Sequence, residues 1–255
     1  MLAVAPTMAH PLPHLPVAAD LFGEIVWNHW QGRPGNFYLR RDDHHLERED
    51  SARYFRLPAQ LPAHQRCLLN HARGQTLDFG AGAGQHALAL QERGVPVIAI
   101  DASPLAVEVC RRRGVADARV LDGLTLDLPP DNLDTVLMMG NTLGIAGTPA
   151  GLRELLLRLH HIVRPGGQIL ADIIDYTATY DPIHLRYHQR NVTRGRYPGT
   201  LTLQLEYQEQ RGPQFDWLLI SLQDLRRIGA ETGWKIVRCV QVMAEATHAV
   251  GMERV

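Results

Sequence analysis

The 255-residue sequence has little cysteine and almost no lysine, and each scarcity excludes a class of protein. Its three cysteines, Cys67, Cys110 and Cys239, are widely spaced and odd in number, so they indicate neither a disulfide framework nor a metal site. We therefore expect reduced thiols in a cytoplasmic protein without a bound metal. Lys235 is the only lysine, and 26 basic against 27 acidic side chains leave a net charge of −1. This balance gives no electrostatic reason to expect nucleic-acid or membrane binding.

Long apolar runs are also missing. No run reaches the length of a membrane-spanning helix, and Met1–Pro16 has no basic segment followed by an apolar one, so we expect neither a membrane anchor nor a signal peptide. A hydrophobic content of 45% and a charged content of 21% are ordinary for a globular protein. The length suffices for one α/β core and an accessory segment. We predict an N-terminal arm and lid over residues 1–60 and a main domain over residues 61–255.

The stretch Leu77–Gln85, with the sequence LDFGAGAGQ, has a glycine at every second position of its turn. Gln75–Phe79 is predicted to be a buried strand and His86–Arg93 the helix that follows. Glycine allows unusual backbone angles and the close approach of a ligand, and the first N–H groups of the helix face whatever lies over the turn. Units of this kind bind nucleotide-like ligands in doubly wound folds, although glycine-rich turns also serve structural purposes.

Strands and helices alternate on either side of this turn. Asp20 is predicted to cap a helix that includes Phe22, Ile25 and Trp30, and a second helix spans Ala63–Arg73. This alternation predicts a parallel sheet with helices on both faces. The further strands are Val95–Ile100, Ala118–Leu121, Leu133–Met139 and Gln168–Ile174, and the further helices are Leu105–Arg113 and Ala150–Val163.

The remaining segments are less regular. Residues 1–19 contain four prolines and are predicted to be a loosely packed arm. Phe37–Arg56 is either a charged surface segment or a lid over the active site. Asp175–Gly199 is predicted to be an irregular connector that is either functional or partly disordered. The last elements that we expect are a half-exposed strand at Leu201–Gln208, a turn at Gly212-Pro213, a helix from Ser221 to Thr232, and a final strand at Trp234–Val242.

Four successive strands of the predicted parallel sheet end in acidic or small polar residues. These ends are Asp78 with Gly80, Asp101, Asp122, and Gly140-Asn141. Acidic residues at strand ends are often only helix caps. In a doubly wound sheet, however, all four would meet at the edge where ligands bind.

The whole pattern resembles the class I S-adenosylmethionine (SAM) dependent methyltransferases along Gln75–Val242. This resemblance implies a Rossmann-like, doubly wound, mostly parallel seven-stranded sheet with an antiparallel C-terminal hairpin strand. Leu201–Gln208 and Trp234–Val242 would form that hairpin. The matching pieces are Leu77–Gly84, Ala99–Pro104, Val120–Gly123, Leu133–Val136 and Val163–Gly167.

The resemblance also implies SAM as the cofactor and assigns roles to the strand ends. Asp101 would accept hydrogen bonds from both ribose hydroxyls, Asp122 would accept from the adenine amino group, and Ala102 and Ser103 would flank the adenine. The carbonyls of Gly80 and Gly140 would receive the ammonium group, and Asp78 would orient the glycine turn or reach the ammonium group through water. The implied cofactor-binding residues are Asp78, Gly80, Ala81, Gly82, Asp101, Ala102, Ser103, Asp122, Gly123, Gly140 and Asn141.

Methyl transfer by in-line displacement requires mainly a near-attack geometry, and a general base only where the acceptor must lose a proton. The candidate bases are His44, His45, His184 and His188. Candidate substrate contacts are Arg53, Tyr54 and Tyr176. Gly140–Gly144 lacks the Asn/Asp-Pro-Pro-aromatic run of enzymes that methylate amino groups of DNA bases. We therefore expect a small-molecule acceptor and no nucleic acid.

Three alternatives remain open at this point. A nicotinamide-dependent oxidoreductase could use a similar fold, although Gln85 stands where a dinucleotide fingerprint needs its third glycine. A non-catalytic SAM-binding protein could keep the fold and lack the chemistry. Aminopropyl transfer is a third possibility, but no paired acidic residues are clearly placed to hold a polyamine.

Overall fold

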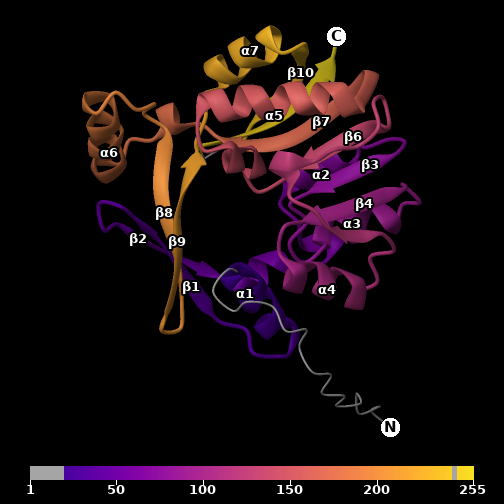
Figure 1. Cartoon of the computed structure of the whole chain (residues 1–255), viewed down its shortest axis with the longest axis horizontal. Coiled ribbons are helices and arrows are strands. Elements are labelled where there is room, and N and C mark those ends of the chain that lie inside the picture. The colour runs from indigo at the N-terminus through magenta and orange to yellow at the C-terminus, as the bar shows by residue number, and fades with distance from the viewer. Residues whose placement is uncertain (1–19, 243–245) are drawn as a thin grey trace.

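The computed structural model describes residues 20–242 and 246–255 and contains two β-sheets (Figure 1). The arm predicted over residues 1–19 lies outside the described residues. The larger sheet has the strand order β10 (Trp234–Gln241), β11 (Thr247–Arg254), β7 (Val163–Ile174), β6 (Leu133–Met138), β3 (Thr76–Phe79), β4 (Val97–Asp101), β5 (Ala118–Val120). The smaller sheet has the order β2 (Leu46–Asp50), β1 (Asn36–Arg41), β8 (Thr200–Tyr207), β9 (Gln210–Leu218).

Five strands of the larger sheet are parallel neighbours, in the order β7, β6, β3, β4 and β5. The chain runs outward from β3 through β4 to β5 and then returns to β6 on the other side of β3. The strand order therefore reverses between β3 and β6, and a crevice opens outside the carboxyl ends of the strands at such a point. β11 is antiparallel to both β7 and β10. The predicted Rossmann-like, mostly parallel seven-stranded sheet is confirmed.

Helices cover both faces of the larger sheet (Figure 1). Alternate residues of the buried strands point to opposite faces, so the sheet has a hydrophobic cluster on each side. The first side carries α2 (Ala63–Leu69), α3 (Gln85–Gln91) and α4 (Pro104–Arg112), and the second carries α5 (Pro149–Ile162) and α7 (Leu222–Glu231). Ser103 and Ser221 cap α4 and α7 by accepting hydrogen bonds from Ala106 N and Asp224 N, as their sequence context predicts.

The helix predicted after Asp20 is α1 (Leu21–Trp30), and it packs against α4. Asp20 Oδ1 accepts a hydrogen bond from Gly23 N at 2.8 Å. Its other carboxylate oxygen accepts from Ser103 Oγ at 2.8 Å, so one side chain ties α1 to the start of α4. The segment Phe37–Arg56 contributes β1, β2 and the 3₁₀ turn η1 (Ser51–Tyr54).

The predicted hairpin between Leu201–Gln208 and Trp234–Val242 is wrong, because these segments lie in different sheets. β8 pairs with β1 and β9, whereas β10 pairs with β11, a strand that the sequence analysis missed. Alternation of apolar residues determines which face of a strand is buried but not which strand is its neighbour. The predicted turn at Gly212-Pro213 is also wrong. Both residues lie within β9, an edge strand, where a proline without an N–H is tolerated.

The predicted irregular connector Asp175–Gly199 contains a helix, α6 (Pro182–Thr193), after the short 3₁₀ turn η5 (Tyr176–Ala178). Asp181 accepts from Ile183 N and Pro182 occupies the first helical position, which together are an ordinary helix start. The sequence analysis missed this helix because the tyrosines, histidines and arginines of the stretch give no clear apolar periodicity. None of the helices in the described ranges combines the length and apolar character that crossing a membrane requires.

Candidate active site

A cavity of about 730 Å³ lies between the carboxyl ends of the parallel strands and the four-stranded sheet. Its floor is the turns that follow β3, β4, β5, β6 and β7, and its other wall is formed by residues of β1, β2, β8 and β9. Nine of the eleven predicted cofactor-binding residues line it. They are Gly80, Ala81, Gly82, Asp101, Ala102, Asp122, Gly123, Gly140 and Asn141.

The glycine-rich turn after β3 has a backbone that glycine alone adopts readily. Gly80, Gly82 and Gly84 have φ angles of 71°, 55° and 77°. A Cβ on Gly82 would stand 3.6 Å from the rings of Phe22 and Tyr54, which both line the cavity. Around the position of a Cβ on Gly140 there is no described atom within 4 Å. Side chains at Gly82 or Gly140 would therefore take up space in the cavity, whereas a Cβ on Gly84 would stand 2.7 Å from Val115 behind the turn.

Asp101 joins the turns that follow β3 and β4. Its carboxylate accepts hydrogen bonds from Gly82 N at 2.8 Å and from Ser103 N at 2.9 Å, one on each oxygen. Burial raises the pKa of Asp101, while the two N–H groups oppose this effect. Each carboxylate oxygen has capacity for a further donor on the cavity side, so Asp101 can hold a pair of hydroxyl groups.

The end of the cavity beyond β5 is formed by Leu121, Asp122 and Gly123. Asp122 Oδ1 accepts from Leu124 N at 2.9 Å and thereby caps the 3₁₀ turn η3 (Gly123–Thr125). A Cβ on Gly123 would come within 2.0 Å of the Phe79 ring. Gly123 is thus required for the close packing of this turn against β3.

Gly140 and Asn141 follow β6, and the side chain of Asn141 is used to hold neighbouring elements together. Its Oδ1 accepts from Ile174 N at 3.1 Å and its Nδ2 donates to Leu218 O at 3.3 Å. Asn141 adopts a left-handed backbone with φ 59°, and its N–H donates to Asp172 Oδ1 at 2.8 Å. Its role is therefore to shape the cavity at the ends of β6 and β7.

Asp78 and Ser103 lie behind the cavity wall. The carboxylate of Asp78 accepts from Ala87 N at 3.1 Å and so anchors the first turn of α3. Burial raises the pKa of Asp78 to about 7, the charge of Asp101 adds to this effect, and the Ala87 N–H opposes it. Ser103 caps α4 and binds Asp20. Both residues support the turns that line the cavity.

Sequence reasoning missed a buried polar network centred on Asp172. This carboxylate accepts from Gln65 Nε2 at 2.7 Å and His64 Nε2 at 3.1 Å as well as from Asn141 N. Burial alone would raise its pKa, but these donors hold the pKa of Asp172 below its ordinary value. Gln65 also contacts His86, and both line the cavity. The available signal was an acidic residue in the middle of the apolar strand Gln168–Ile174.

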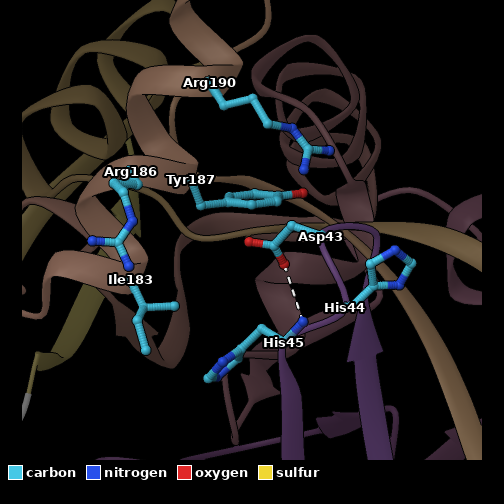
Figure 2. Close-up of a pocket in the computed structure, with 7 residues that line it drawn as sticks. All are labelled: Asp43, His44, His45, Ile183, Arg186, Tyr187 and Arg190. Atoms are coloured by element: carbon cyan, nitrogen blue, oxygen red, sulfur yellow. Dashed lines mark hydrogen bonds between the residues drawn. The ribbon is translucent and has the colours of Figure 1, made fainter.

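The histidine candidates are divided by the hairpin of β1 and β2. His45, His184 and His188 line the large cavity. His44 lines only a second, shallower pocket of about 410 Å³, which His45 lines as well (Figure 2). That pocket is bounded by the β1–β2 turn and α6, and the imidazole of His44 points away from that of His45 (Figure 2).

The three candidate substrate contacts, Arg53, Tyr54 and Tyr176, all line the large cavity. Arg53 is ion-paired with Glu49. Arg56 also lines the cavity and forms no ion pair with another described residue. Burial raises the pKa of Tyr54 to about 12, so its hydroxyl remains a neutral donor at physiological pH.

The glycine-rich turn after β3 and the carboxylate of Asp101 at the end of β4 meet in one cavity of a doubly wound sheet. This arrangement is typical of Rossmann-like nucleotide-binding domains. The profile of a family described as "Methyltransferase domain" matches residues 76–167, which span β3 to the start of β7. A SAM-dependent methyltransferase from Bacteroides fragilis, determined in complex with S-adenosylhomocysteine, superimposes with a TM-score of 0.81. It is 29% identical, and the match covers 94% of this chain and 97% of that one. Residues 76–167 therefore match a methyltransferase domain, and over nearly its whole length the chain is similar in fold to a SAM-dependent methyltransferase.

Curated relatives match over a shorter segment. Demethylmenaquinone methyltransferase from Clavibacter sepedonicus is 35% identical over 98 residues, which are 37% of this chain and 38% of that protein. Malonyl-[acyl-carrier protein] O-methyltransferase from Serratia marcescens is 32% identical over 102 residues, or 40% of this chain and 38% of that protein. The chain thus spans about two fifths of the length of these relatives, and their names identify no acceptor for it.

Proposed function

We propose that this protein binds SAM at the strand edge and transfers its methyl group to a small-molecule acceptor. The observation that supports this most directly is the position of Asp101, a buried carboxylate that links two turns and faces the cavity. When bound, SAM supplies a methyl group on a sulfonium, which already carries a good leaving group. The protein therefore needs mainly to hold the acceptor in line and to exclude water.

The residues at the strand edge suit SAM in three places. Asp101 would accept from the ribose hydroxyls, Asp122 from the adenine amino group, and the open backbone at Gly80 and Gly140 would receive the amino-acid part. Ala102 and Gly123 line the wall between these sites. The small side chains leave room that any larger residue would take.

Two residues of the N-terminal segment suit the carboxylate of SAM. Tyr54 lies beside Gly82 and offers a neutral hydroxyl donor. Arg53 is engaged by Glu49, so Arg56 is the better cationic partner. We propose that residues 20–60, the described part of the predicted arm and lid over residues 1–60, act as cover for the site of the domain over 61–255, since Phe22, Phe37 and Tyr54 line the cavity. A cytoplasmic location is also proposed, in keeping with three unpaired thiols.

Calorimetric titration tests the cofactor assignment. We expect S-adenosylhomocysteine to bind with a dissociation constant of roughly 1 μM to 1 mM, as is usual for enzyme substrates. NADH should give no binding heat, because Gln85 replaces the third glycine of a dinucleotide fingerprint. Binding of NADH without binding of S-adenosylhomocysteine would contradict the proposed function.

A further inference from the structure

The four-stranded sheet presents most of one face to the cavity. Leu39 of β1 pairs with Leu205 of β8, and Leu201 pairs with Trp217 of β9, so these side chains share a face. Residues at every second position of each strand line the cavity, as a half-exposed sheet requires. The lining residues of this face are Phe37, Leu39, Arg41, Glu47, Glu49, Leu201, Leu203, Leu205, Phe215 and Trp217.

The two faces of this sheet differ in chemistry. The outer face carries ion pairs such as Arg40 with Glu206 and Arg196 with Asp216. The inner face is mostly apolar and only partly filled by core side chains. Phe37 is buried against Ile25 of α1, whereas Phe215 keeps 36% of its surface exposed. Partly exposed aromatic and leucine side chains in a cavity bind flat apolar ligands. We call this inner face and the cavity volume beside it the acceptor chamber.

Trp217 connects the acceptor chamber to the strand edge. A Cβ on Gly144 would stand 2.4 Å from Trp217 Nε1 and 2.9 Å from the side-chain amide of Asn141. The indole therefore packs over the 3₁₀ turn η4 (Thr142–Ala146) that follows Asn141. The apolar face of the four-stranded sheet therefore adjoins the ends of β6 and β7 at Trp217.

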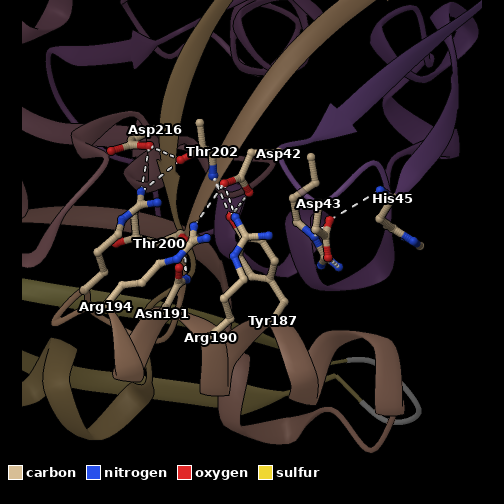
Figure 3. Close-up of polar contacts among 12 residues, drawn as sticks. Asp42, Asp43, His45, Tyr187, Arg190, Asn191, Arg194, Thr200, Thr202 and Asp216 are labelled. Carbon is tan, nitrogen blue, oxygen red and sulfur yellow. Dashed lines mark hydrogen bonds and ion pairs between the residues drawn. The ribbon is translucent and has the colours of Figure 1, made fainter.

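Helix α6 closes the chamber and is held on the β1–β2 hairpin by polar contacts. Tyr187 Oη donates to Asp42 Oδ1 at 2.7 Å, and Arg190 also pairs with Asp42 (Figure 3). Arg41 Nη1 donates to His184 Nδ1 at 3.0 Å. Because a guanidinium has no acceptor, His184 must carry its proton on Nε2. These contacts fix the face of α6 from which His184 and His188 enter the cavity.

His188 lies where the chamber meets the strand edge. Its ring packs edge-on against Tyr176 at 5.3 Å between centroids, and Tyr176 follows β7, whose Ile174 is bonded to Asn141. Within the described ranges, no residue forms a hydrogen bond with the His188 ring. Burial, the neighbouring His184 and the charge of Arg41 together lower the pKa of His188 to about 4. A neutral imidazole keeps one N–H donor at any physiological pH.

Positive and negative groups lie on different sides of His188. Arg41 lies on the β1 side, where Asp43 accepts two of its N–H groups, and His45 packs edge-on against His184. On the β7 side, Asp175 accepts from Thr177 N and Leu222 N, and its carboxylate faces His248. Glu47 lies on the β2 side of the sheet. The charge of Arg41, which disfavours a proton on His188, also favours an anionic ligand atom beside it.

We propose, building on the proposed function, that the acceptor is a flat aromatic or fused-ring molecule with an acidic phenolic or enolic hydroxyl, bound as its oxyanion. Its ring lies against Leu203 and Trp217, and its anionic oxygen accepts the N–H of His188. A buried anion needs a donor of this kind, because burial without one is costly. His188 is thus a positioning residue for the reacting oxygen.

Methyl transfer to this oxyanion needs no protein base. The hydroxyl proton is lost to solvent on binding. The anionic oxygen then forms a bond to the methyl carbon as the sulfur–carbon bond breaks, and the bonding pair stays on sulfur. The sulfonium charge and the oxyanion charge cancel together, which removes charge from a buried site.

Titration of 4-nitrophenol onto the full-length protein tests this assignment, because the phenolate form of the probe has its own absorption band. The titration is run with and without S-adenosylhomocysteine over a range of pH. We expect bound probe to ionise at least about one pH unit lower than free probe, which is about tenfold preference for the phenolate. 4-Nitroanisole, with no ionisable proton, should bind about tenfold more weakly.

Three variants separate the contributions. His188→Phe keeps a ring against Tyr176 but has no N–H, so the ionisation shift should disappear. Trp217→Ala should weaken both forms of the probe without changing the shift. His161→Phe, on the exposed face of α5, is the matched control and should behave as the wild type.

An unshifted or raised pKa of the bound probe, equal binding of 4-nitroanisole, or a retained shift in His188→Phe would each overturn the acceptor assignment. Since the optical titration needs no methyl transfer, these outcomes leave SAM binding intact. Failure of S-adenosylhomocysteine to bind in calorimetry would instead contradict the proposed function, so the two failures are distinguishable.

Discussion

Replacing Asp101 with asparagine should weaken S-adenosylhomocysteine binding by about 10- to 150-fold. The carboxylate accepts from Gly82 N and Ser103 N and would still accept from the ribose hydroxyls. In Asp101→Asn, an NH₂ donor replaces one of the two carboxylate oxygens that accept hydrogen bonds. At least one charge-assisted hydrogen bond is therefore lost. Such a bond contributes about 1.5–3 kcal/mol, which corresponds to this range of dissociation constants. Calorimetry measures the change directly.

The control for this variant is Asp117→Asn, just before β5, where the carboxylate pairs with Arg119 on the surface. It should bind S-adenosylhomocysteine as the wild type does. Because burial raises the pKa of Asp101, affinity in the wild type should fall as the pH is lowered and Asp101 takes up a proton. In Asp101→Asn this dependence should be lost. An unchanged dissociation constant in Asp101→Asn would show that Asp101 only stabilises the turns.

Asp78→Asn should make the protein relatively more stable as the pH rises from about 4 to about 7. Burial raises the pKa of Asp78 to about 7 in the folded protein, whereas an unfolded aspartate titrates near about 3.9. Between these values the folded state holds a proton that the unfolded state releases. The wild type therefore loses stability as the pH rises through this window, by up to ~4 kcal/mol, and the amide does not.

Urea unfolding of both proteins at several pH values measures this effect. The difference in unfolding free energy, wild type minus Asp78→Asn, should fall with pH between the two pKa values and stay constant above about pH 7. Taking the difference cancels other titrating groups, including His86, whose pKa burial lowers. A difference that does not vary with pH would show that Asp78 is ionised in the folded protein throughout.

The sequence was most informative where a residue type strongly favours one local backbone structure. Asp20 and Ser103 are caps, Pro104 begins α4, and the glycines after β3 have positive φ angles, all of which local sequence predicts. The apolar runs likewise predicted the buried strands of the parallel sheet. Nine of the predicted cofactor residues share a cavity because the carboxyl ends of parallel strands meet at one edge.

What local sequence could not supply was the pairing of distant segments. β1 and β8 are neighbours although about 160 residues separate them. Neither strand carries a local sequence signal that identifies its pairing partner. The acceptor chamber depends on that pairing, so Leu203 and Trp217 could not be recognised as cavity residues. The same holds for Asp172, whose partners Gln65 and Asn141 come from α2 and the end of β6. Such contacts are consequences of topology.

In the proposed function, SAM binds across the strand ends with its ribose on Asp101. A crystal structure of the protein with S-adenosylhomocysteine tests it most directly. We predict both ribose hydroxyl oxygens within about 2.5–3.0 Å of the Asp101 carboxylate, with the adenine beside Asp122. A ligand bound elsewhere, or an Asp101 carboxylate that contacts only Gly82 and Ser103, would contradict the account.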